Sequence, residues 1–181
     1  TKNNFKYPST SIEATGNLNI VADEVFNASN MSAKKVSLEL NNLTNISLSK
    51  NLASINGENI DIKAKNNISN IGSIISAKNN LNISAIQIKN ISTQHINTNV
   101  EGIKKSTLEN ISKIEAGNNI LIKTDSLKNL AGNIKSGNDL NIKSSNVEIG
   151  DISLNNKENK RKYELNIVDT IGSEISGKNI H

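Results

Sequence analysis

The 181-residue sequence contains no cysteine, no tryptophan, one proline, one methionine and only 2% aromatic residues. Without cysteine the chain has no disulfide framework, no thiol nucleophile and no zinc–thiolate site. A globular enzyme of this length usually buries several aromatic side chains, because each removes a large apolar area from water. The shortage of aromatics therefore argues against a compact globular core.

Long apolar runs and concentrated charge are also missing. No stretch of eighteen apolar residues occurs, so we expect no membrane span, and the first ten residues lack the apolar centre of a signal peptide. The net charge is +4, and lysines alternate with acidic residues along most of the chain. Nucleic-acid binders usually gather basic residues beside stacking aromatics. We therefore expect no nucleic-acid partner.

The residues that are abundant are isoleucine and asparagine, with 28 and 34 copies. AT-rich codons would explain this bias without any structural reason. Isoleucine nevertheless suits β-strands, and asparagine suits turns with positive φ. The composition is thus compatible with many short strands joined by tight turns.

One phrase recurs along the chain: a small or turn-forming stretch followed by an apolar–x–apolar triplet. Clear copies are IEAGNNILIKT at 114–124 and IKSGNDLNIKS at 134–144. Successive triplets begin 18, 24, 21, 39, 20 and 40 residues apart, so the underlying period is about twenty residues. The first residues of the triplets are Leu18, Val36, Ile60, Leu81, Ile120, Leu140 and Ile180.

Short strands repeating at this period, with no helical pattern between them, predict an all-β parallel β-helix. The triplet-initial residues would stack in one interior column, and a second column would hold Ile20, Leu38, Ile62, Ile83, Ile122 and Ile142. Asparagines at the repeated turns can tolerate left-handed geometry, and we expect them to hydrogen-bond to one another along the axis. With coils about 4.8 Å apart, roughly seven to nine of them would make a rod of about 35–45 Å.

Three other interpretations remain open. A leucine-rich repeat has a similar period but requires the LxxLxLxxN pattern, which the triplets lack. An antiparallel β-sandwich could use the same strands, although it would not need copied turns. Biased composition could also produce repeats by chance.

The two doubled intervals contain segments that break the period, near 92–111 and 152–171. Both alternate apolar and polar residues on either side of a turn or a charged stretch. We predict that each is a β-hairpin projecting from the helix and that each interval also absorbs one ordinary coil. A plain loop is the alternative for both.

The phrases IEAGNNILIKT, IKSGNDLNIKS and GSEISGKNI resemble the haemagglutinin repeats of filamentous haemagglutinin-like exoproteins. These include secreted partners of two-partner secretion systems and stalks of contact-dependent growth inhibition proteins. The segment at 146–177 is similar to the hairpin-bearing interruptions of such repeats. The resemblance covers most of the chain from about residue 16.

What the resemblance implies is a right-handed parallel β-helix, exported through a dedicated outer-membrane transporter and then secreted or displayed on the bacterial surface. Such a filament serves adhesion or presents a toxin to neighbouring cells, so a surface receptor or glycan is the expected partner. The NPNL- and NPNG-type motifs of the family's secretion domain do not occur here. We therefore expect residues 1–181 to be a single internal shaft fragment, truncated at both ends.

Residues that could support catalysis are sparse. His95 and His181 are far apart in sequence, and no nucleotide, metalloprotease, hydrolase or calcium-repeat motif occurs. We expect no enzymatic activity, no cofactor and no metal. A polysaccharide-acting β-helix enzyme would need grouped acids, whereas the acids considered are scattered: Asp61, Glu115, Asp125, Asp139, Glu148 and Asp151.

One basic cluster stands out in the second hairpin. It could contact anionic glycans or lipid headgroups, or it could simply keep a hairpin tip soluble. The chain is thus expected to be a structural and adhesive shaft, with a receptor- or glycan-binding module built on the hairpins as the alternative. The residues of this candidate contact are Lys157, Lys160, Arg161, Lys162 and Tyr163.

The stacked columns can be tested with a single charge. Replacing Ile142 by aspartate is expected to lower the free energy of unfolding by several kcal/mol, because a carboxylate would replace an aliphatic member of a column. Urea denaturation of Ile142→Asp and of the parent chain measures the difference. Equal stability of the two proteins would contradict the stacked arrangement.

Overall fold

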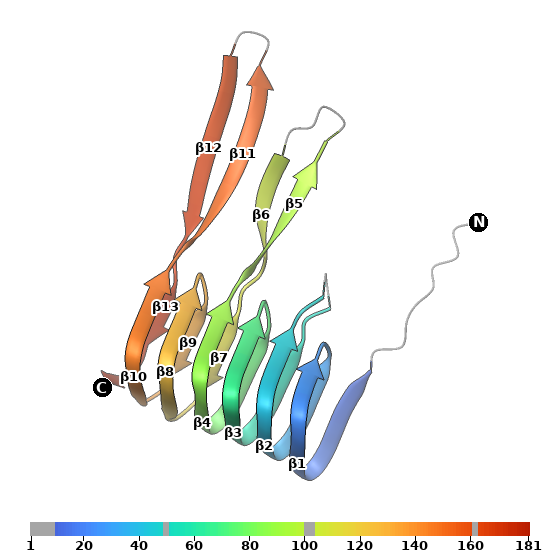
Figure 1. Ribbon diagram of the computed structural model, residues 1–181, viewed down its shortest axis with the longest axis vertical. Helices are drawn as coiled ribbons and strands as arrows, with labels where there is room; N and C mark the ends of the chain where they lie inside the picture. The colour runs from blue at the N-terminus through green and yellow to red at the C-terminus, as the bar shows by residue number, and fades with distance from the viewer. Residues whose placement is uncertain (1–9, 49–50, 100–103, 161–162) are drawn as a thin grey trace, which may run out of the picture.

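The computed structural model describes residues 10–48, 51–99, 104–160 and 163–181, with the side chains of 157–166 left outside that description. Every regular element within these ranges is a β-strand, and they contain no helix that could cross a membrane. Parallel strands wind into a solenoid of about six turns with coils of about 21 residues, and a small antiparallel sheet projects from it (Figure 1). The predicted parallel β-helix is confirmed.

The first four coils are formed by long strands that bend around the solenoid: β1 (Ser11–Asn27), β2 (Asn30–Ile46), β3 (Ser54–Ile71) and β4 (Ile74–Ile91). Later coils are divided into shorter strands: β7 (Lys113–Ala116), β8 (Ile120–Leu130), β9 (Asn133–Ser136), β10 (Asp139–Gly150), β13 (Glu174–Ser176) and β14 (Asn179–Ile180). Each coil pairs in parallel with the coil before it.

Both predicted aliphatic columns are confirmed residue by residue. Leu81 pairs with Ile60 on one side and Ile120 on the other, and Ile83 pairs in the same way with Ile62 and Ile122. Most members of the columns are fully buried, and burial of each such side chain contributes about 1.5–3 kcal/mol before chain entropy is counted. The interior contains two further aliphatic columns: Met31, Ile55, Ile75, Ile114 and Ile134; and Val25, Leu43, Ile68, Ile88 and Leu127.

The predicted number of coils was wrong. Leu81 pairs directly with Ile120, and Leu140 pairs directly with Ile180, so no additional coil lies within either doubled interval. Each interval is one coil with a hairpin inserted into it. The hairpins are about as long as a coil, which is why the spacing resembled a missing repeat. The solenoid therefore has about six turns rather than seven to nine.

A ladder of buried asparagines runs through the solenoid beside the aliphatic columns. Asn27, Asn45, Asn70, Asn90 and Asn129 form it, and their exposed fractions are 4% or less. Each Nδ2 donates to the Oδ1 of the next asparagine, at 2.7–2.8 Å. The remaining N–H of each amide reaches a main-chain carbonyl; that of Asn70 donates to Ser73 O at 2.9 Å. The interior is thus polar along one column without leaving those amides unpaired.

The predicted asparagine ladder at the repeated turns is also present, on the surface. Asn118 Nδ2 donates to Asn80 Oδ1 at 3.0 Å, and Asn138 donates to Asn118 in turn. These asparagines do not use the left-handed geometry that asparagine tolerates. Among described residues other than glycine, only Ala131 has positive φ, at 49°. The stacking of successive coils places these amides side by side, so the turn asparagines need no positive φ to form the ladder.

The buried ladder makes a strong stability prediction. Asn70→Ala would leave a donor on Asn45 and an acceptor on Asn90 without partners inside the protein, and is expected to cost about 2–4 kcal/mol. Asn67→Ala is the matched control, because Asn67 donates to Asn42 at 2.9 Å on the exposed surface. Its expected cost is within about 0.5 kcal/mol. Urea denaturation compares the two variants, and similar losses would contradict a structural role for the buried ladder.

Candidate interaction surface

Both predicted hairpins are confirmed, and the plain-loop alternative is wrong. The first consists of β5 (Thr93–Thr98) and β6 (Lys104–Asn110), and the second of β11 (Ile152–Lys160) and β12 (Tyr163–Ile171). Their bounds agree with the predicted segments near 92–111 and 152–171. Together they form one antiparallel sheet in the order β12–β11–β6–β5, which we call the blade (Figure 1).

Both hairpins leave the solenoid at the same corner, which we call the hairpin corner. Main-chain hydrogen bonds stack Ser47, Gly72, Ser92 and Ala131 there as one column. A second column contains Ala53, Ser73, Ser112 and Gly132. All of these residues are small because the corner lies against the buried asparagines. A Cβ added at Gly132 would lie 2.5 Å from Asn90 Nδ2 and 2.7 Å from Asn129 Oδ1.

Inserted and direct turns alternate at this corner. Residues 48–52, 93–111 and 152–172 are inserted after the coils that contain β2, β4 and β9–β10 respectively, while the coils between them turn directly through Gly72–Ser73 and Ala131–Gly132. These two turns have left-handed backbone at their first residue, with φ of 55° at Gly72 and 49° at Ala131, whereas the direct Ala28–Ser29 turn between β1 and β2 does not. Ser47, Ser92 and Asp151, which occupy the same place before the insertions, do not have positive φ.

The alternation matches the width of a hairpin to the pitch of the solenoid. Neighbouring strands in any sheet lie about 4.7–4.9 Å apart, so the two strands of a hairpin occupy the height of two coils. Hairpins inserted two coils apart can therefore stand side by side and pair. β6 and β11 do so in antiparallel orientation at Asn156 and Lys105, and Ser106 N donates to Asn156 Oδ1 at 3.0 Å.

The predicted basic contact falls at the far end of the second hairpin. Lys157 and Lys160 lie on β11, and Lys160 pairs through its main chain with Tyr163 on β12. Arg161 and Lys162 lie outside the described residues. Contact between this cluster and an anionic partner stays a prediction.

Groups that could act in acid–base or metal chemistry are dispersed over the described surface. His95 Nε2 lies 2.7 Å from Asn97 Oδ1 on exposed β5. Several of the acids considered have individual partners: Asp61 with Lys63, Glu115 with Lys113, Glu148 with Lys128, and Asp139 with Asn179. Within the described ranges no three His, Asp or Glu side chains form a group able to hold a metal ion.

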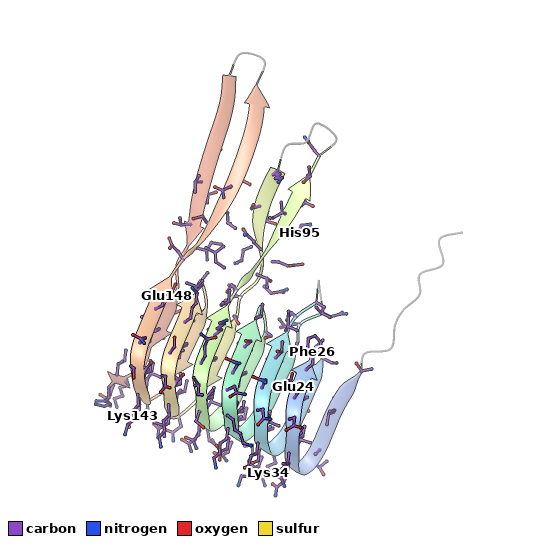
Figure 2. All side chains as sticks on the ribbon, in the orientation of Figure 1. Glu24, Phe26, Lys34, His95, Lys143 and Glu148 are labelled. Carbon is purple, nitrogen blue, oxygen red and sulfur yellow. The ribbon has the colours of Figure 1, made fainter. Side chains whose placement is uncertain are left out.

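The outer surface of the described coils carries charged side chains of both signs. Figure 2 shows Glu24, Lys34 and Lys143 on the outside of the solenoid, with His95 on the blade. A shallow hollow of about 400 Å³ lies over residues 21–23, 39–41 and 63–65. Its lining combines Asp23 and Glu39 with Lys63 and Lys65, so it presents mixed charge to solvent.

Comparisons with protein families, curated proteins and solved structures were made for the whole chain. None of them gives a match. The fold and the blade therefore have to be interpreted from the chain's own residues.

Two features of the structure were not predicted from the sequence: the buried asparagine ladder and the contact between the hairpins. The buried asparagines recur at nearly the same intervals as the triplets, and this spacing was the signal that could have identified them. The contact between the hairpins depends on Asn156, which lies fifty residues from Ser106 in sequence. No local pattern distinguishes Asn156 from its neighbour Asn155.

The contact between the hairpins can be tested at one hydrogen bond. Asn156→Ala removes the side-chain acceptor of the Ser106 amide, and a lost hydrogen bond of this kind weakens local structure by about 1–2 kcal/mol. We expect faster hydrogen exchange at Ser106, with little change at the buried Ile83. Asn155→Ala is the control, because Asn155 is exposed. Unchanged exchange at Ser106 in Asn156→Ala would contradict the assigned contact.

Proposed function

We propose that this chain is a section of the rigid shaft of a large bacterial exoprotein that is secreted or displayed on the cell surface. Its role is spatial: it holds recognition or toxic domains at a distance from the cell, and any binding uses its outer faces. The observation that carries the proposal is the uninterrupted stack of coils. Four aliphatic columns and a buried asparagine ladder run through successive coils, and the insertions leave the stack intact.

The stack supports a shaft because every coil is fixed to its neighbours by the same bonds. Parallel pairing links each coil to the next along most of its length. Bending the rod would stretch the main-chain hydrogen bonds on its convex side. It would also stretch the hydrogen bonds between the buried asparagine side chains. A stiff rod whose charged side chains lie on its outer surface suits the display of other domains.

A receptor- or glycan-binding module is the second candidate function. The blade favours it, because the blade is the largest departure of the described chain from the regular coil and it projects away from the solenoid (Figure 1). On this alternative, the basic cluster at 157–163 would bind an anionic partner, such as an acidic glycan or a lipid headgroup. On this alternative the coils only support the hairpins.

Deletion of residues 155–166 distinguishes the two functions. The shaft proposal predicts that binding of the parent exoprotein to target cells is unchanged, since the deletion shortens a hairpin and leaves the coils intact. The measurement is cell binding by flow cytometry, with thermal unfolding to check the fold. A charge-only variant, with Lys157, Lys160 and Lys162 changed to glutamine, is the control. Loss of binding in both variants, with normal unfolding, would favour the receptor module instead.

A further inference from the structure

The two outer strands of the blade have unpaired edges within the described structure. In the order β12–β11–β6–β5, the strands β12 and β5 each pair on one side. Unpaired edges invite the addition of another strand, and proteins usually protect them with lysine, proline or a bulge. β12 and β5 contain neither lysine, arginine nor proline, whereas the lysines of the blade lie on the inner strands β6 and β11. Both edges therefore lack lysine and proline, although β5 has a register shift between Thr93 and Gln94 and β12 carries the acidic residues Glu164 and Asp169.

Of the two edges, β12 is the better site for another strand. It has nine residues, against six in β5, and it pairs with β11 along its whole length without a bulge. Ile167 and Val168 near its centre are 37% and 58% exposed. Figure 1 shows β5 on the side of the coils formed by β1–β3, whereas β12 lies at the opposite edge of the blade.

We propose that two copies of this chain associate through β12, edge to edge and antiparallel, so that their blades form one continuous sheet. The pairing of β6 with β11 already joins two hairpins of this chain in antiparallel orientation. A second copy placed on β12 continues the same sheet in the same manner. The inference concerns the purified chain and does not depend on the proposed shaft role.

The sequence of β12 suits pairing with itself. A two-fold axis at Ile167, the central residue of the strand, places all nine residues opposite residues of the second copy. Such an interface is isologous, because the same strand is used on both sides. In this register neither Glu164 nor Asp169 lies opposite another acidic residue, which avoids the destabilisation caused by like charges directly across a sheet.

A lysine placed at the edge tests the proposal. Val168→Lys is expected to weaken dimerisation by about tenfold or more, because an edge lysine opposes strand addition. Analytical ultracentrifugation over a range of concentrations measures the dissociation constant. Val21→Lys is the matched control, since Val21 is 81% exposed on β1, at the other end of the molecule. It should leave the dissociation constant unchanged.

Cysteine cross-linking provides an independent test of the register. Residues opposite one another in antiparallel strands have Cα atoms about 4.5–5.5 Å apart, within the range that a disulfide spans. Because the chain has no cysteine, Ile167→Cys introduces a single thiol, and the oxidant diamide should link two copies covalently. Val21→Cys, treated in the same way, should remain monomeric on a denaturing gel.

Three results would overturn the proposal. The first is a wild-type chain that stays monomeric at every concentration, which would mean that β12 is bare or is covered by a different polypeptide. The second is a dimer that is disrupted by Val21→Lys and not by Val168→Lys, which would assign association to the β1 end of the solenoid. The third is equal cross-linking of the two cysteine variants, which would indicate random collision.

Discussion

The structure depends on the parallel main-chain pairing that joins each coil to the next. Because the paired strands lie about 4.7–4.9 Å apart, a residue in one coil can be followed only by a residue of similar shape and polarity in the next. Aliphatic residues therefore stack on aliphatic residues, and Asn70 stacks between Asn45 and Asn90. The sequence repeat is the direct result of this constraint.

The same constraint explains how an asparagine can be fully buried without a large cost. An isolated buried amide would lose its hydrogen bonds to water. In the ladder each amide meets an identical group at the distance set by strand spacing, and Asn90 donates to Asn129 Oδ1 at 2.7 Å and to Asn133 O at 3.2 Å. Neighbouring coils supply the partners that water would otherwise provide, so each rung depends on those next to it.

The stacked columns could be predicted from sequence because strand pairing repeats a local pattern at each coil. The positions of Leu18 through Ile180 in one column follow from the triplets alone. The number of coils could not be predicted in this way, since a hairpin as long as a coil gives the same spacing as an extra coil. The pairing of β6 with β11 also has no local signal, because it depends on where two distant segments leave the solenoid.

The hairpin corner links the regular coil to the irregular surface. The two direct turns that lie between insertions use left-handed backbone, at Gly72 and Ala131, whereas the coils that begin an insertion do not. Because the hairpins are inserted at every second coil, each hairpin has a space that is two coils high. This height equals the width of the two strands of the hairpin. The pitch of the solenoid thus sets the spacing of the blade. A single insertion would make an isolated hairpin of marginal stability, whereas two insertions at this spacing make a four-stranded sheet whose outer edge, β12, has the geometry to accept another strand.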